Sequence, residues 1–211
     1  MKVLIIGGGA SGMAAALSAA RDPANSVTLL ERQARVGRKL LATGNGRCNL
    51  TNRELGPEHY HGEQPEFALP ALRTWGVETT LAEFRRLGLV TVTEPGGRVY
   101  PFSDQANSVV DVLRFALDAA GVTVDNYSIR SNNGQALFGT NPSVNAQIDA
   151  FAEYDLVILQ YGLNIMQEGV TNYSAYAARV EKMIAFVRNC FPEAAVLVLS
   201  GCGRQQLPEE T

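Results

Sequence analysis

The feature that most constrains this chain is a cluster of glycines between a short strand and a helix. Lys2–Ile6 is rich in β-branched apolar residues, which is typical of a buried parallel strand. The six residues that follow have the spacing G-x-G-x-x-G, and an alanine-rich helix is predicted from about Ser11 to Arg21. A second strand, Ser26–Leu30, ends at Glu31. The sequence therefore predicts the first half of a βαβ unit, with the glycines at the turn from strand to helix.

The spacing gives each glycine a physical role in binding a dinucleotide. Gly7 permits a tight turn, Gly9 lets the backbone approach a pyrophosphate, and Gly12 lets the helix pack closely on the strand. The amides at the helix N-terminus, at Ala10 and Ser11, then face the phosphates together with the helix dipole. The alternative is a glycine turn that serves only the packing of the two elements.

An acid stands where such a unit binds a ribose. Glu31 lies 24 residues after Gly7, at the end of the second strand, where its carboxylate can accept hydrogen bonds from ribose hydroxyls. A carboxylate there favours an unphosphorylated ribose, as in FAD or NAD. We therefore predict a dinucleotide site that includes Glu31 and the glycine turn.

The rest of the chain alternates between helices and strands. Pro65–Leu87 and Asn107–Ala120 have helical periodicity, and a Glu94-Pro95-Gly96-Gly97 turn predicts a hairpin between Leu89–Val92 and Arg98–Tyr100. Arg32–Asn52 is predicted to be a loop with one helical turn. Farther on, the predicted strands are Val122–Ile129, Asp155–Gln160 and Ala194–Leu199, and the predicted helices are Ser143–Tyr154 and Tyr173–Cys190. This alternation predicts an α/β fold with parallel sheet.

The character of the sequence changes near residue 124. Residues 1–124 carry 13 Lys+Arg and 12 Asp+Glu, a net charge of +1, whereas residues 125–211 carry 5 and 9, a net charge of −4. Tyrosine and asparagine are also denser in the second part. Such a shift is what two separate origins would leave, although a single domain can show it by chance.

Residues 1–122 resemble a known family. The run Gly37-Arg38-Lys39-Leu40-Leu41-Ala42-Thr43-Gly44-Asn45-Gly46-Arg47-Cys48-Asn49-Leu50-Thr51-Asn52, with the later Gly97-Arg98-Val99-Tyr100-Pro101-Phe102-Ser103, is similar to motifs of NAD(P)/FAD-dependent oxidoreductases of the aminoacetone-oxidase-like bacterial flavoproteins. The resemblance implies a Rossmann-like FAD-binding domain with an inserted segment. Arg38 and Lys39 would supply positive charge to the pyrophosphate or flavin, and Gly44 and Asn45 would offer close approach and amide donors. The alternative for these residues is a solvated basic loop.

Residues from about 122 to 200 resemble an internal part of the SGNH/GDSL hydrolase family. The resemblance rests on Asp125-Asn126-Tyr127-Ser128-Ile129-Arg130 and on Tyr161-Gly162-Leu163-Asn164. It implies a flavodoxin-like parallel α/β fragment in which Gly134 and Asn164 line an oxyanion hole. Asn164 as an ordinary turn residue is the alternative.

That second part lacks the other groups of a serine hydrolase. Serine catalysis needs a nucleophile and a base, usually histidine, and the chain's two histidines, His59 and His61, lie in the first part. We therefore predict no complete catalytic set. His59 and His61 lie two residues apart in a polar loop with Glu58 and Glu63, which could suggest a metal site. Exposed loop histidines are commoner than metal ligands, so we predict no metal site.

Charge and cysteine content exclude several classes of partner. A net charge of −3 and a pI near 5.5 lack the basic footprint of a nucleic-acid or membrane-surface binder. Three scattered cysteines favour a reducing compartment, and the glycines interrupt the N-terminal apolar run too early for a signal peptide. We therefore expect a cytoplasmic protein whose partner is a dinucleotide cofactor.

These observations together predict a chimera. A Rossmann-like FAD-binding fragment, residues 1–122, would precede an SGNH-like fragment, residues 123–211, with a loose tail from residue 201. We expect limited shared core between them, exposed sheet edges that favour self-association, and FAD as a cofactor ahead of NAD(P). The predicted function is an oxidoreductase-type FAD-binding protein that is incomplete as an enzyme. The alternatives are an SGNH-type esterase fragment without its serine and histidine, and an inert or nucleotide-binding chimera.

Overall fold

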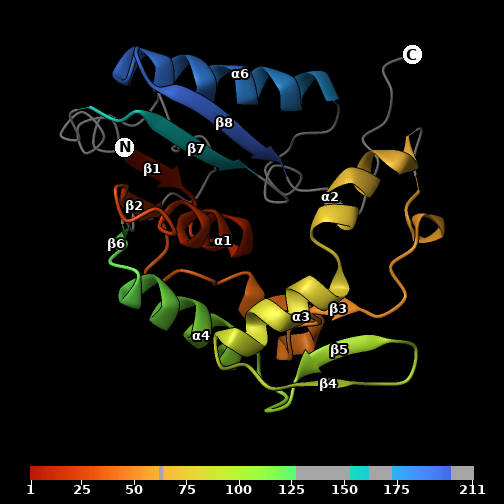
Figure 1. Cartoon of the computed structure of the whole chain (residues 1–211). Helices are drawn as coiled ribbons and strands as arrows, with labels where there is room; N and C mark the ends of the chain where they lie inside the picture. The colour runs from red at the N-terminus through yellow and green to blue at the C-terminus, as the bar shows by residue number, and fades with distance from the viewer. Residues whose placement is uncertain (62–63, 127–152, 162–172, 201–211) are drawn as a thin grey trace. The chain divides into compact units, whose positions relative to one another are not determined.

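The structure, a computed structural model, describes residues 1–61, 64–126, 153–161 and 173–200. The chain forms two compact units (Figure 1). One, here called the sheet unit, comprises Met1–Val36 and Leu117–Thr211. The other, here called the hairpin unit, comprises Gly37–Ala116. Each is described by itself.

A five-stranded parallel sheet forms the centre of the sheet unit. Its strands are β1 (Lys2–Ile6), β2 (Ser26–Glu31), β6 (Thr123–Asn126), β7 (Leu156–Tyr161) and β8 (Ala195–Ser200), in the spatial order β6-β2-β1-β7-β8. In the register of the sheet, Ile6 of β1 lies opposite Leu30 of β2 on one side and opposite Leu159 of β7 on the other. The chain thus runs outward from β1 on one side and then returns to its other side, which is the doubly wound order of Rossmann-like folds.

Helices cover both faces of this sheet. α1 (Ala10–Ala19) and α6 (Tyr173–Cys190) lie on opposite faces (Figure 1). The two faces follow from strand alternation, because Ile5 approaches α1 at Gly12 whereas Leu4 belongs to the core packed against α6. Within the described ranges, no helix is both long enough and apolar enough to cross a bilayer.

One hydrophobic core joins the early and late parts of the sheet unit. It consists of buried side chains of β1, β2, β7 and α6 and of the residue after α6: Leu4, Leu30, Val157, Leu159, Met183, Val187 and Phe191. Tyr154 packs edge-on against the Phe191 ring with centroids 5.3 Å apart. A buried aliphatic side chain contributes roughly 1.5–3 kcal/mol, so this cluster is a main source of stability for the unit.

The prediction of limited shared core between residues 1–122 and 123–211 is therefore wrong. β7 lies hydrogen-bonded beside β1, and the Asp155 side chain accepts a 2.6 Å bond from the Lys2 amide at the start of the pair.

The hairpin unit has a small antiparallel sheet. Its strands are β3 (Thr51–Asn52), β5 (Arg98–Pro101) and β4 (Thr91–Thr93), in the order β3-β5-β4. The helical segments are η1 (Leu40–Gly46), η2 (Pro57–His59), η3 (Pro65–Ala68), α2 (Leu69–Thr74), α3 (Val77–Arg86) and most of α4 (Ala106–Ala119). The Arg53 side chain pairs with Glu78 of α3, and so links the residue after β3 to that helix.

Most predicted elements agree with the structure in type. The fold class, α/β with a parallel Rossmann-like sheet, is confirmed, and so is the hairpin around Glu94–Gly97. The helix predicted over Pro65–Leu87 is instead divided, because the non-helical backbone of Trp75 ends α2 and the extended backbone of Gly76 caps the start of α3. The helix predicted over Ser143–Tyr154 and the tail from residue 201 lie outside the described residues.

Replacing Leu159 tests the shared core. Leu159 is 1 % exposed, so Leu159→Ala should cost about 2–5 kcal/mol in the free energy of unfolding measured with urea. Leu197 on the neighbouring strand β8 is 48 % exposed, and Leu197→Ala should cost less than about 1 kcal/mol. Equal losses from the two variants would contradict a core shared by β1, β7 and α6.

Candidate functional site

The glycine turn begins as a continuation of the sheet. The amide of Gly7 donates to the Leu30 carbonyl at 2.8 Å, which extends the pairing of β1 and β2 by one residue. Gly7 then adopts a φ of 111°, a conformation that residues with a side chain rarely adopt. The chain turns there and enters α1, whose first intrahelical bond runs from the Met13 amide to the Gly9 carbonyl at 2.9 Å.

Gly12 lies against the backbone of the turn. A Cβ atom on Gly12 would lie 1.8 Å from the carbonyl oxygen of Gly7, so no side chain fits at this position. The close packing expected of Gly12 is thus packing of the helix against the turn itself. This contact brings the first turn of α1 to the carboxyl end of β1.

The N-terminus of α1 is suited to an anion. Gly9 is its N-cap, no side chain caps it, and its first turn carries no acid. Ala10 and Ser11 are exposed there. The first N–H groups of a helix lack intrahelical partners and stand at the positive end of its dipole, so a phosphate group would satisfy them.

Glu31 is held at the end of β2 by two backbone amides. Its Oε2 accepts from the Gly8 amide at 2.8 Å and its Oε1 accepts from the Gln33 amide at 2.7 Å. The carboxylate therefore lies beside the glycine turn, at the edge where the parallel strands β1 and β2 end. Glu31 thus contacts Gly8, within the turn that also contains Gly7 and Gly9 and leads into Ala10, Ser11 and Gly12 of α1. That these residues bind a cofactor remains a prediction.

The topology places this turn where doubly wound sheets bind ligands. The strand order reverses at β1, which has β2 on one side and β7 on the other. Ligands of such sheets bind outside the carboxyl ends of the strands at this reversal. The turn from β1 into α1 lies at that point.

The other predicted cofactor residues belong to the hairpin unit. Arg38 and Lys39 are exposed just before η1. Gly44 and Asn45 follow with left-handed backbone, at φ of 55° and 56°. A Cβ on Gly44 would lie 2.6 Å from the Asn49 amide nitrogen, so the loop closes tightly on itself. A part for these four residues in a cofactor site remains a prediction.

Arg47 ties this loop to the hairpin. Its guanidinium hydrogen-bonds the carboxylates of Glu94, in the β4–β5 turn, and Asp104, after β5, and lies 4.0 Å over the Tyr100 ring. The bonds to Glu94 and then to Asp104 raise the pKa of Arg47 above its usual value. Arginine suits this place because its planar group bonds two acids while stacking on an aromatic ring.

Cys48 is a structural thiol in this geometry. It is buried at the end of the loop with a φ of 61°, and its amide donates to the Thr43 carbonyl at 3.0 Å. Burial raises the pKa of the Cys48 thiol, against a smaller opposite effect of a hydrogen bond with Thr43. A raised pKa lowers the thiolate fraction and with it the reactivity.

Several predicted residues lie outside the described residues. Gly134 and Asn164, expected to line an oxyanion hole, are among them.

His59 lies in η2 with its Nε2 3.5 Å from the Glu58 carboxylate. Over the described part of the chain, no group of three or more His, Cys, Asp or Glu side chains could hold a metal.

Sequence reasoning missed two residues of these clusters. Gly8 occupies a variable position of G-x-G, yet a Cβ there would lie 2.9 Å from Glu31 Oε2 and 2.6 Å from Val36 Cγ1. Arg47 belongs to the Gly37–Asn52 motif, which does not indicate its partners. The acids that bind it are 47 and 57 residues away along the chain, so no local pattern indicates them.

Comparisons with known proteins agree with this geometry. Residues 1–184 match the family described as "HI0933-like protein Rossmann domain". The chain is 50 % identical over 117 residues to the 3-dehydro-bile acid delta(4,6)-reductase of Clostridium scindens, which covers 55 % of this chain and 28 % of the reductase. It is 30 % identical over 129 residues to the ribosomal RNA dihydrouridine synthase of Haemophilus influenzae, covering 57 % of this chain and 30 % of the synthase. The chain thus spans less than a third of the length of these curated relatives.

The comparison with solved structures gives alignments of low similarity. The crystal structure of Thermovibrio ammonificans THI4 aligns with a TM-score of 0.43 at 13 % identity, over 89 % of this chain and 61 % of that one.

The family match crosses the join predicted near residues 121–125 and continues to residue 184, and nothing in the comparisons shows an SGNH/GDSL segment.

Arg47→Met tests the role of the Arg47 cluster. The variant leaves Glu94 and Asp104 without their shared cation and uncovers the Tyr100 ring, so the midpoint of thermal unfolding should fall. The midpoint should fall less in Arg47→Lys, which keeps the charge but not the planar group. The matched control Arg114→Met removes an exposed arginine paired with Asp111 one helical turn away and should change the midpoint little. A loss in the control as large as in Arg47→Met would contradict the role.

Alkylation measures the state of Cys48. Brief treatment of the folded protein with iodoacetamide near neutral pH should leave Cys48 unmodified, because the thiol is buried and its raised pKa keeps it protonated. The half-buried Cys190 should react faster, and both should react fully in denaturant, as read by peptide mass spectrometry. Rapid labelling of Cys48 in the folded protein would mean that its thiol is accessible and ionised.

Proposed function

The chain belongs to the family of HI0933-like protein Rossmann domains, and on that premise we propose that it is the dinucleotide-binding part of a flavin-dependent oxidoreductase. The cofactor proposed is FAD. One relative is named a reductase and another a dihydrouridine synthase. Because the chain spans less than a third of those relatives, the activity and the substrate of the whole protein belong to this proposal.

The observation that carries the proposal is the arrangement of the glycine turn. A turn of three glycines follows β1, the N-terminus of α1 after it has no side-chain cap, and the Glu31 carboxylate accepts from the Gly8 amide of the turn. A dinucleotide presents the matching groups, a doubly charged pyrophosphate and a ribose with two hydroxyls. We propose that Gly9, which has no side chain, lets the pyrophosphate approach the backbone.

Each residue then has a part in holding FAD. The first-turn amides of α1, at Ala10, Ser11 and Gly12, would donate to the pyrophosphate, and Glu31 would accept from the adenosine ribose. When bound, the flavin ring would supply hydride and electron transfer. The residues of this chain would bind and orient the adenosine-diphosphate end.

Glu31 also supports the order of preference among cofactors. A carboxylate at this place repels a ribose 2′-phosphate, so NADP is disfavoured relative to NAD and FAD. The similarity of the Gly37–Asn52 motif to flavoproteins is what ranks FAD before NAD. Arg38, Lys39, Gly44 and Asn45 are proposed to serve the pyrophosphate or the flavin, since two are exposed cations and two form a loop with left-handed backbone.

The alternatives have less support. No observation on the described residues favours an SGNH-type esterase, whose Gly134 and Asn164 lie outside them. A chimeric origin and an incomplete active site remain hypotheses without support from the comparisons. Self-association through the edge strands β6 and β8 remains a proposal, since an edge strand offers free backbone groups to a second chain.

A charge placed at either end of α1 tests the proposal. Ser11→Asp puts a carboxylate beside the proposed pyrophosphate, and repulsion across a few ångströms should weaken FAD binding at least about tenfold. The same charge near a helix N-terminus stabilises the helix by about 0.3–1 kcal/mol, so the loss cannot come from unfolding. FAD affinity is measured by the quenching of flavin fluorescence, and unfolding by urea.

The matched control is Ser18→Asp. Ser18 is exposed in the last turn of the same helix, so this variant should keep FAD affinity and lose a few tenths of a kcal/mol in stability. The proposal fails if the unmodified chain binds no FAD, or if Ser11→Asp binds FAD as the unmodified chain does. ADP should compete with FAD, whereas FMN, which lacks the adenosine end, should bind weakly.

A further inference from the structure

The carboxylate of Glu31 is engaged before any ligand binds. Both of its oxygens accept hydrogen bonds from backbone amides, Oε2 from Gly8 at 2.8 Å and Oε1 from Gln33 at 2.7 Å. Both bonds are partly buried. Hydrogen bonds from N–H groups to an ionised carboxylate are among the stronger ones in proteins. Glu31 thus connects the turn after β1 with the chain after β2.

The packing around Gly8 is built for this contact. Gly8 is buried, and a Cβ on it would lie 2.9 Å from Glu31 Oε2, 3.0 Å from Glu31 Cβ and 2.6 Å from Val36 Cγ1. Its φ lies outside the left-handed region, so the backbone itself would accept another residue. Gly8 is therefore a glycine because Glu31 and Val36 lie too close to admit a Cβ atom. The G-x-G spacing does not indicate this requirement.

The bond to Glu31 also decides which amides remain for a phosphate. The Gly8 N–H points at the carboxylate, and the Gly7 N–H points at the Leu30 carbonyl at 2.8 Å. The amides of Gly7 and Gly8 are therefore engaged, and we assign an anion to the amides that follow them, in the first turn of α1. The direction of these donors depends on where the turn is held, and Gly8 is the residue through which Glu31 holds it.

We propose that Glu31 is a positioning residue of the glycine turn: its carboxylate clamps the amides of Gly8 and Gln33, and dinucleotide affinity depends on this clamp as well as on the ribose contact. A carboxylate oxygen has a second lone pair, so the clamp and a ribose contact are compatible. The statement about affinity rests on the proposed function, whereas the statement about the clamp concerns the chain without ligand.

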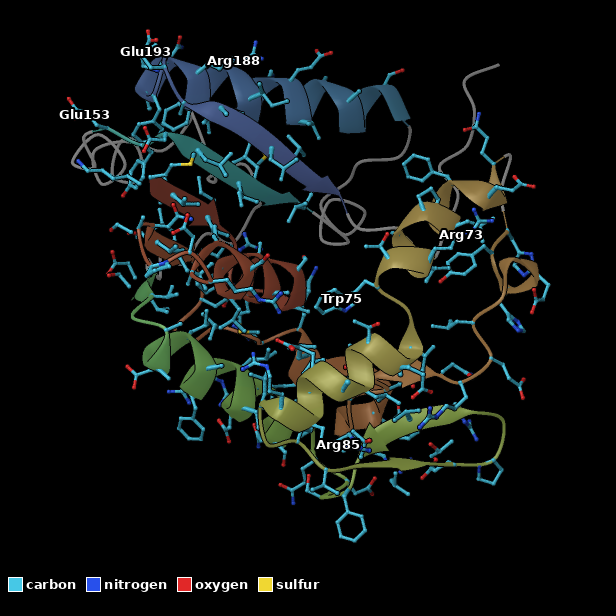
Figure 2. The ribbon with its side chains drawn as sticks, in the orientation of Figure 1. Arg73, Trp75, Arg85, Glu153, Arg188 and Glu193 are labelled. Atoms are coloured by element: carbon cyan, nitrogen blue, oxygen red, sulfur yellow. The ribbon has the colours of Figure 1, made fainter. Side chains whose placement is uncertain are left out.

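The first measurement uses no ligand. Amide hydrogen exchange by NMR should be slow at Gly8 and Gln33 in the unmodified chain. In Glu31→Gln it should be at least about tenfold faster at one or both of these amides, because the neutral side-chain amide accepts at one oxygen only and the two N–H groups cannot both keep their acceptor. The matched control is Glu193→Gln, an exposed acid of the same unit at the outer surface (Figure 2), which should leave both amides unchanged. Unchanged exchange in Glu31→Gln overturns the proposal.

The second measurement separates the clamp from the ribose contact. ADP and 2′,3′-dideoxy-ADP, which lacks both ribose hydroxyls, are titrated against each variant by calorimetry. Glu31→Gln should weaken binding of both nucleotides by about tenfold. If Glu31 acted through the ribose alone, only ADP would lose affinity, and the dideoxy analogue would bind both proteins equally. That second outcome overturns the proposal.

A second variant leaves Glu31 in place. Gly8→Ala adds a methyl group against Glu31 and Val36, displaces the carboxylate and should weaken both nucleotides as Glu31→Gln does. Circular dichroism verifies that each variant is folded. If the unmodified chain binds neither nucleotide, the proposed function and the statement about affinity both fail, while the exchange rates still decide whether the clamp exists.

Discussion

The pairing of β1 with a parallel strand on each side is the constraint on which the rest of the sheet unit depends. β1 hydrogen-bonds β2 along one edge and β7 along the other. Its residues alternate between the α6 face and the α1 face. Parallel pairing on both edges places the carboxyl end of β1 at the point where strand order reverses. The glycine turn lies at that point because it follows β1 directly, and Glu31 reaches it because β2 ends one strand away.

Much of this arrangement is predictable from local sequence. The strand Lys2–Ile6, the turn and the helix after it follow from apolar pattern and glycine spacing, and the helix Tyr173–Cys190 follows from its 3.6-residue period. The hairpin around Glu94–Gly97 follows from its turn residues. These features depend on neighbours within a few residues, which are all present in the local sequence.

The remaining features depend on residues far apart in the chain. Nothing in the pattern of Asp155–Gln160 indicates that its partner is β1. The interpretation of the chain as two fragments of different families therefore predicts little shared core. Two further features likewise depend on tertiary contacts: the bonds of Arg47 to Glu94 and Asp104, and the close packing of Val36 on Gly8. The position of Glu31 is predicted from spacing, but its hydrogen bond with the Gly8 amide of the turn is not.

The strand order has a consequence for how this chain acquires its structure. Val3 pairs with Val27 on one edge but with Leu156 on the other. While the chain is synthesised from its N-terminus, β2 becomes available soon after β1, but the second edge of β1 waits for more than a hundred further residues. Until then an apolar strand has an open edge, the kind of surface that chaperones cover and that aggregation exploits. The strand that opens the sequence is thus among the last whose pairing is completed, and this late closure is expected to slow folding.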